Sequence, residues 1–157
     1  MMNKLIKENR STIGCVVLTV IVSVFLFKYV LYLGFVPSES MAPTLEAGNI
    51  VIGIRRDHDY HVNDIVIFEK ENYAMVKRIA ADQDDLIEYK AQKVLVNGVE
   101  KGSIKEGYEA AFQIEKDHYY MLGDNCEHSY DSRYWDQPTV DKSNVLAKVI
   151  WIIPTSL

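Results

Sequence analysis

The sequence has few cysteines and no excess of positive charge. The two cysteines among the 157 residues are Cys15, inside an apolar run, and Cys126, far along a polar region. A disulfide between two such positions is not expected, so the fold must be stable without one. The formal net charge is −5 at pH 7, whereas binding to a phosphate backbone calls for a basic surface. The composition therefore argues against nucleic acid as the partner.

After residue 36 the sequence also lacks a long apolar run and a clear helical stripe of three or more turns. Short runs rich in β-branched residues alternate there with turn residues, which is typical of strands. Asn97-Gly98 indicates a hairpin, because a type I′ turn needs positive φ at both central residues. We expect a mostly β fold, with one small antiparallel β domain over residues 37–157. The predicted strands cover residues 49–54, 64–69, 73–80, 85–90, 93–96, 99–101, 118–122 and 147–153.

The apolar residues are concentrated near the N-terminus. Residues 11–36 carry a single charge, that of Lys28. At about 1.5 Å per residue, a helix of this length crosses a hydrocarbon core of about 30 Å. A cleaved secretory signal peptide is the alternative, but no small-x-small cleavage site follows the run. The sequence therefore predicts a retained transmembrane anchor over residues 11–36.

The residues around this anchor predict its orientation. Three basic residues lie within residues 1–10, and Lys28, Tyr29 and Tyr32 lie near the other end of the run. Basic residues mark the cytoplasmic side, whereas aromatic rings and long lysine side chains favour the membrane interface. We expect residues 1–10 in the cytoplasm and residues 37–157 outside the cell membrane, beginning at its surface.

Two serines directly follow the anchor. Ser38 and Ser40 lie between Pro37 and Pro43, in a stretch whose backbone has little freedom. A serine hydroxyl is a weak nucleophile unless a base activates it. Lys77 lies in a mostly apolar, strand-like run, and burial there would lower its pKa until the amine is neutral and accepts a proton. A serine of this stretch and Lys77 are therefore the candidate nucleophile and base.

A third segment, residues 120–135, leaves a predicted strand and becomes a polar turn. Within it, Asp131 and Arg133 can pair with each other, and Ser129 can hydrogen-bond to a lysine amine. A loop rich in turn formers, without a functional role, explains this segment equally well when it is taken alone.

The three segments together resemble the bacterial type I signal peptidases. The resemblance rests on the following runs in chain order: Pro37-Ser38-Glu39-Ser40-Met41-Ala42-Pro43-Thr44-Leu45, then Val76-Lys77-Arg78-Ile79, then residues 123–135 with Gly123-Asp124-Asn125, Ser129 and Asp131-Ser132-Arg133-Tyr134-Trp135. It covers nearly the whole chain. Only about 40 residues separate the second motif from the third, so the chain resembles the short form, similar to the enzymes of Gram-positive bacteria.

The resemblance implies a membrane-bound serine endopeptidase with a Ser-Lys dyad. It implies Ser40 as the nucleophile and Lys77 as the general base. The hydroxyl of Ser38 and the backbone N–H of Ser40 would form the oxyanion hole, and Ser129 would orient the lysine. Asp131 and Arg133 match residues that keep such a site in shape.

The resemblance also implies a substrate. Exported preproteins carry small residues at −1 and −3 of the cleavage site, and five residues match positions that line the corresponding pockets: Val36, Met41, Leu45, Met75 and Val76. Ordinary core packing is the alternative for these five. The implied partners are preproteins and the lipid bilayer.

Two departures from the family pattern concern loops. Asn63-Asp64 stands where the family has Gly-Asp, and asparagine tolerates positive φ better than most residues. Residues 81–85 replace a Gly-x-Pro-Gly-Asp turn, which leaves the conformation of that loop open.

Other functions share parts of this sequence pattern. A non-cleaving assembly factor or a dedicated peptidase for a surface structure such as a pilus has the same architecture, but a non-cleaving factor has no need of Ser40 or Lys77. A soluble self-cleaving regulator resembling the SOS repressors would carry a DNA-binding domain and no anchor.

His58 and His61 have a His-x-x-His spacing without a cysteine partner, so we expect no metal, and no cofactor is implied.

Overall fold

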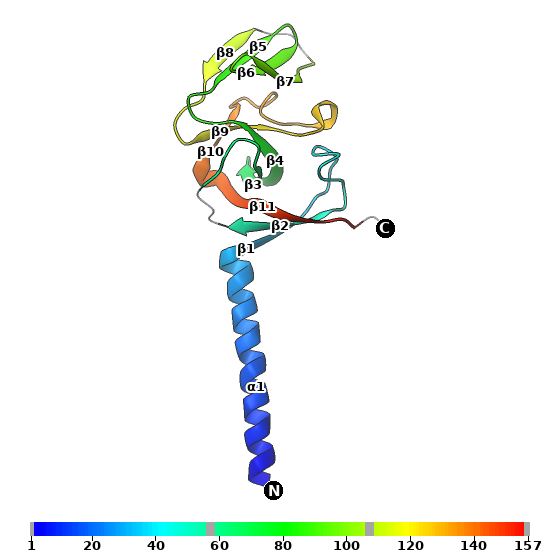
Figure 1. Cartoon of the computed structure of the whole chain (residues 1–157), viewed down its shortest axis with the longest axis vertical. Helices are drawn as coiled ribbons and strands as arrows, with labels where there is room; N and C mark the ends of the chain where they lie inside the picture. Colours follow the sequence, from blue (N-terminus) through cyan, green and yellow to red (C-terminus); the bar gives the residue numbers. More distant parts are fainter. Residues whose placement is uncertain (1, 56–58, 106–108, 156–157) are drawn as a thin grey trace.

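The computed structural model describes residues 2–55, 59–105 and 109–155, with side chains from residue 12 onward. A long N-terminal helix, α1 (Met2–Phe25), continues through a π-helical turn, η1 (Leu26–Val30), and projects from a compact β body (Figure 1). Strand β1 (Leu31–Phe35) follows without a break. The remaining strands are β2 (Ile50–Arg55), β3 (Ile65–Lys70), β4 (Tyr73–Ala81), β5 (Leu86–Lys90), β6 (Lys93–Val96), β7 (Val99–Ser103), β8 (Ala110–Gln113), β9 (His118–Leu122), β10 (Thr139–Asp141) and β11 (Val145–Ile153).

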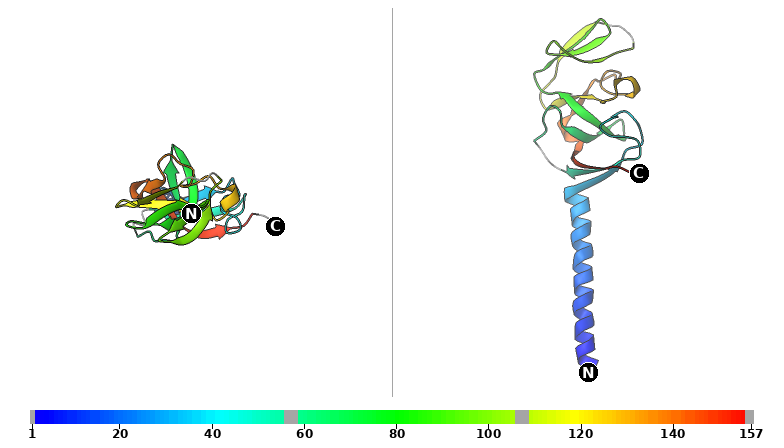
Figure 2. Two further views of the ribbon diagram at one scale, coloured as in Figure 1. Left: turned by 90° about the horizontal axis from the view of Figure 1, so that it is seen from above. Right: turned by 45° about the vertical axis from the view of Figure 1, so that its right-hand side comes forward.

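From residue 12 onward the helix is exposed, and it is apolar enough to cross a membrane. Residues Thr12–Val30 have a mean hydropathy of 2.4, and none of this stretch is buried against the body. A helix satisfies all its backbone hydrogen bonds internally, as a segment in lipid must. The right-hand view of Figure 2 also shows it standing apart from the strands. Within the described residues, one helix thus has the length and composition of a membrane span.

The helix ends before the apolar run does. We predicted an anchor over residues 11–36, but Leu31–Phe35 form β1 and pair antiparallel with β2, from Leu31 opposite Ile54 to Phe35 opposite Ile50. Tertiary pairing overrides the helical continuation, because an apolar run of this length suits a strand as well as a helix. The helical span therefore closes at Val30.

The body consists of two antiparallel sheets. Seven strands form the larger one in the order β1-β2-β11-β3-β4-β9-β10, and four form the smaller in the order β7-β6-β5-β8. The smaller sheet lies at the end of the body farthest from α1 (Figure 1). These sheets confirm the prediction of a mostly β fold with a single N-terminal apolar helix.

Turn chemistry agrees with the sequence at two places. Asn97 and Gly98 have φ angles of 50° and 78° between β6 and β7, as a type I′ hairpin requires. Asn63 has a φ of 80° ahead of β3, so asparagine keeps the turn for which the family uses glycine.

Besides β1, two short strands were not predicted from the sequence. Strand β8 has no β-branched residue, and β10 has only three residues.

Three clusters of buried side chains hold the body together. The central cluster packs Phe68 and Val66 of β3 against Ile79 of β4, Met121 of β9 and Trp135. Phe68 is fully buried, and its ring meets that of Trp135 at a centroid distance of 6.0 Å. Because β3 and β4 lie at the middle of the larger sheet, this cluster fixes the strand that carries Lys77.

We expect Phe68→Ala to lower the free energy of unfolding by about 3–5 kcal/mol, through lost burial and the cavity left behind. Tyr73→Ala serves as a control, because Tyr73 is 69% exposed and its loss should cost little. Denaturation of the full chain in detergent, followed by circular dichroism, measures both changes. Equal effects of the two substitutions would contradict this assignment of the core.

Candidate active site

A short loop between β1 and β2 carries both serines. Its ends are joined by two backbone hydrogen bonds, from Val36 to Asn49 at 2.9 Å and from Gly48 to Val36 at 2.8 Å. Met41 and Leu45 are fully buried and pack with Val36 in the cluster beneath the larger sheet. Since Val36 before Ser40 and Met41 after it are both buried in the core, the backbone of Ser40 is held in place.

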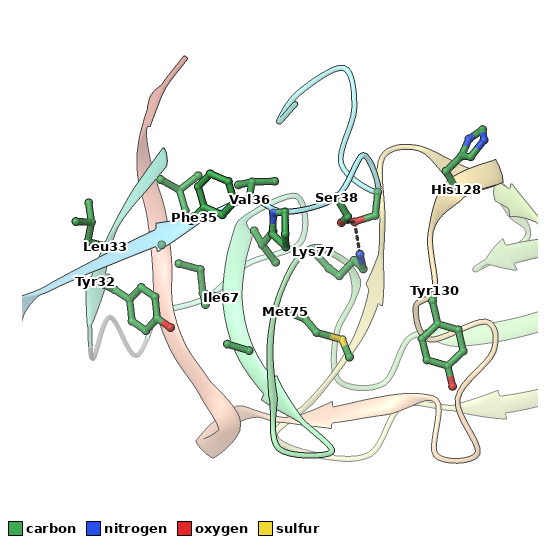
Figure 3. A pocket seen from close by; sticks show the side chains of 16 residues that line it. Tyr32, Leu33, Phe35, Val36, Ser38, Ile67, Met75, Lys77, His128 and Tyr130 are labelled. Carbon is green, nitrogen blue, oxygen red and sulfur yellow. Dashed lines mark hydrogen bonds between the residues drawn. The ribbon is translucent and has the colours of Figure 1, made fainter. Parts of the chain in front are cut away.

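Ser40 and Lys77 are in direct contact. The Lys77 amine lies 2.5 Å from the Ser40 hydroxyl, and each residue is only 5% exposed. Lys77 comes from β4, where it stands opposite Val66 of β3. The dashed line at Lys77 in Figure 3 marks this hydrogen bond. The contact joins residues 37 positions apart in the sequence, as the motifs predicted.

The surroundings of Lys77 favour its neutral form. Burial lowers its pKa from 10.5 to about 8, the nearby Asp131 carboxylate opposes this, and the Arg133 guanidinium assists it. About a tenth of the amine is therefore neutral at pH 7, far more than for an ordinary lysine. A neutral amine at 2.5 Å from a hydroxyl has the geometry and the basicity of a general base.

Ser38 lies on the same loop beside the dyad. Its hydroxyl is 3.4 Å from the Ser40 hydroxyl. A hydroxyl donor this close to a nucleophile can stabilise negative charge that develops on a carbonyl oxygen under attack. The structure thus places the Ser38 hydroxyl next to the candidate nucleophile.

An ion pair buried behind Lys77 holds the third motif. Arg133 donates to both carboxylate oxygens of Asp131, each at 2.7 Å, and both side chains are completely buried. Asp131 also accepts a hydrogen bond from the backbone of Gly123 at 2.9 Å and one from the Ser129 hydroxyl at 2.6 Å. Such a pair offsets its desolvation only because every oxygen is hydrogen-bonded.

Ser129 takes a different partner from the one expected. We predicted that its hydroxyl orients Lys77, whereas among the described residues its hydrogen bond goes to Asp131. The carboxylate attracts the hydroxyl more strongly than a neutral amine would, because charge-assisted hydrogen bonds are the stronger ones. Ser129 therefore reaches Lys77 through Asp131, whose charge acts on the pKa of that lysine.

Gly123 lets the first and third motifs come together. A Cβ atom at this position would collide with the Ser129 hydroxyl and with the carbonyl oxygen of Ser40, and it would lie 2.6 Å from the Ser129 Cβ. Asn125 adds a further tie, since its backbone N–H donates to the same Ser40 carbonyl at 3.1 Å. The loop after β9 thus packs directly against the backbone of Ser40.

A cavity of about 500 Å³ opens beside the dyad. Val36, Met75 and Val76 line it, as the resemblance implied, whereas Met41 and Leu45 pack in the core and do not. Sequence reasoning did not identify the lining residues of β1, nor Ile67, His128 and Tyr130. Strand alternation would have indicated Ile67, but no sequence signal marks which loop residues face a cavity.

No metal site accompanies this cavity among the described residues. The part of the chain that the structure describes contains no group of three or more histidine, cysteine or acidic side chains placed to hold a metal ion. The His61 ring nitrogen Nε2 lies 3.4 Å from a carboxylate oxygen of Asp59. His58, the other histidine of the His-x-x-His spacing, lies outside the described residues.

Comparison with known proteins gives consistent matches. A family model described as signal peptidase, peptidase S26, matches residues 9–153. Signal peptidase I of Leptolyngbya laminosa is 29% identical over 163 aligned positions, which cover 91% of this chain and 77% of that protein. Signal peptidase I of Bacillus amyloliquefaciens is 30% identical, over 79% of this chain and 75% of that protein. Signal peptidase I of Pseudomonas aeruginosa is 29% identical, and the match covers 56% of its length.

We expect Gly123→Ala to destabilise the body by about 1–3 kcal/mol, the usual cost of forcing extra atoms into a packed site. The new methyl group would push the Ser129 segment away from the Ser40 backbone. Gly14→Ala is the control, because a Cβ there meets nothing within 4 Å. Thermal unfolding of both variants in detergent tests this, and an unchanged midpoint for Gly123→Ala would contradict the packing described.

Proposed function

The chain belongs to the signal peptidase family, peptidase S26, and from that premise we propose that Ser40 and Lys77 are the dyad with which this serine peptidase removes signal peptides. The single observation that carries the assignment is the contact of 2.5 Å between a buried hydroxyl and a buried amine. A non-cleaving assembly factor is not favoured, because such a protein has no use for this pair.

In the first step the neutral Lys77 amine accepts the proton of the Ser40 hydroxyl. The Ser40 oxygen attacks the carbonyl carbon of the last residue of the signal peptide, and an acyl-enzyme forms as the mature part leaves with a proton from Lys77. The backbone N–H of Ser40 and the hydroxyl of Ser38 would stabilise the oxyanion, where one lost donor typically costs about 2.7–4 kcal/mol.

In the second step a water molecule hydrolyses the acyl-enzyme. Lys77 again accepts a proton, this time from the water, and the Ser40 oxygen regains its proton when the ester bond breaks. Asp131, Arg133 and Ser129 do not touch the reacting atoms in this scheme. They hold the amine and the nucleophilic loop in position through the packed loop that follows β9.

Two strand edges support a substrate bound as an extended chain. Strand β1 is the edge of the larger sheet, and β4 pairs with β9 only from Arg78 onward. Among the described residues, Ala74–Lys77 of β4 therefore have no strand on the side away from β3. Both segments line the cavity beside the dyad. A signal peptide segment between them would gain main-chain hydrogen bonds, while its alternate side chains enter shallow pockets.

The pockets near the dyad favour small residues at −1 and −3. Val36, Met75 and Val76 narrow the cavity close to Ser40, and larger substrate side chains would clash with them. Met41 and Leu45 lie behind this wall and support it from the core. This division of roles fits the substrates of the family, which are preproteins with signal peptides.

The protein is membrane-anchored, and we place residues 37–157 on the outer side. The basic residues within residues 1–10 support a cytoplasmic N-terminus. Large apolar side chains are exposed on the strands nearest the helix, namely Leu33, Phe35, Ile150, Trp151 and Ile153. Figure 1 shows β1, β2 and β11 at the end of the body where α1 joins it. An apolar surface beside a membrane span is suited to contact with lipid.

Ser40→Ala and Lys77→Arg should each abolish cleavage of a labelled preprotein by the detergent-solubilised enzyme. The first removes the nucleophile, and the second replaces the base by a guanidinium that stays charged. Electrophoresis of the products follows the reaction, with Lys142→Arg as a matched surface control. Cleavage by Lys77→Arg at the parent rate would sink the proposed role of the lysine.

The pH dependence of kcat/KM should show a single limb set by Lys77. Below a pH of about 8 the amine is mostly protonated and cannot act as a base, so activity should rise about tenfold per pH unit and level off above that value. Initial rates from pH 6 to pH 10 measure the limb. A limb centred near pH 10.5, the ordinary lysine value, would contradict the lowered pKa.

A further inference from the structure

We propose that His128 and Tyr130 form a binding surface for the first residues of the mature protein, on the leaving side of the scissile bond, and that it prefers apolar side chains there. We call this pair the mature-side rim. The inference rests on the proposed function and extends it to a part of the substrate that the dyad does not touch.

The rim belongs to the same cavity as the dyad. His128 and Tyr130 line it together with Ser40 and Lys77, although they come from the loop after β9. In Figure 3 the Lys77 amine lies between the rim and the apolar half of the cavity, where Tyr32, Leu33 and Phe35 are drawn. The cavity thus continues past the reacting atoms in two directions.

The position of the membrane indicates which side of the cavity receives the signal peptide and which receives the mature segment. The signal peptide is still embedded in lipid, so it must approach the dyad from the membrane side. Strand β1 follows the membrane helix directly at Leu31 and lines the apolar half of the cavity. The loop with the rim lies farther from α1 than β1 does (Figure 1). The mature segment therefore leaves past His128 and Tyr130.

Tyr130 is held rigidly with one face open. Its neighbours in the sequence, Ser129 and Asp131, are both buried and hydrogen-bonded to each other. Its ring stacks on Tyr134 at 6.4 Å and 12°, and meets the Trp135 ring at 71°. Even so, 55% of the residue is exposed. A fixed aromatic ring loses little entropy when it contacts an apolar side chain, which makes it effective in recognition.

His128 links the rim to the nucleophile. Its backbone N–H donates to the Asn125 carbonyl at 3.1 Å, and its ring lies 3.3 Å from the Asn125 side-chain oxygen. Asn125 in turn donates to the carbonyls of Ser40 and Glu39. The rim is therefore fixed relative to the atom that attacks the substrate, as a leaving-side subsite must be.

Two peptide substrates test the proposal. Both carry the same residues up to the cleavage site and alanine at +1; the short one ends there as an amide, and the long one continues with leucine at +2 and +3. The parent enzyme should cleave the long substrate with a higher kcat/KM, by roughly three- to tenfold, as expected for contacts with an aromatic ring. Tyr130→Ala should bring this ratio close to one, and Tyr130→Phe should retain it.

Tyr73→Ala is the matched control, since Tyr73 is also exposed, at 69%, lies outside the cavity, and should keep the parent ratio. If Tyr130→Ala keeps the parent ratio of kcat/KM between the long and the short substrate, even with lower rates on both, the proposed role of the mature-side rim is refuted. A parent enzyme without preference for the long substrate would do the same. A parent enzyme that cleaves neither peptide nor a preprotein would instead refute the proposed function.

Discussion

The site depends on one energetic constraint: a lysine amine is kept away from water next to a serine hydroxyl. A charged ammonium is costly to bury, and this cost is what lowers the pKa of Lys77 to about 8. The sheet contributes to this burial, because β4 pairs with β3 at Val66 opposite Lys77, and the Lys77 side chain meets the Ser40 loop. The same burial would be harmful elsewhere in a small β domain, since it lowers stability wherever the amine is protonated.

The ion pair behind the dyad has two opposed effects on this lysine. Asp131 raises the pKa of Lys77, while Arg133 lowers it, so the neutralised pair adds little net charge to its surroundings. With hydrogen bonds from Gly123, Ser129 and Arg133, the carboxylate ties three parts of one loop together. The pair therefore supplies rigidity, and leaves the tuning of the amine mainly to burial.

Much of this arrangement could be predicted from the sequence, and the failures have physical causes. Motif order predicted that Ser40 meets Lys77, and turn chemistry predicted the hairpin at Asn97-Gly98. The helix boundary was wrong because Leu31–Phe35 are equally apolar in a strand or a helix, and only pairing with β2 decides between them. Met41 and Leu45 face the core rather than the cavity. Their direction follows from how an irregular loop folds, which no periodicity encodes.

The direct connection between the apolar helix and β1 limits the distance between the helix and Ser40. Strand β1 begins at Leu31, directly after the helix ends at Val30, so no flexible segment joins the two elements. With the helix in a bilayer, this connection would restrict movement of the dyad toward or away from the membrane. Each residue of an extended strand adds about 3.3 Å, and the height of Ser40 above the lipid is thus set by a handful of residues. Under the proposed function, a preprotein would have to match this height with its own spacing between hydrophobic segment and cleavage point. Scissile bonds too close to the membrane, or too far from it, would then not reach Ser40.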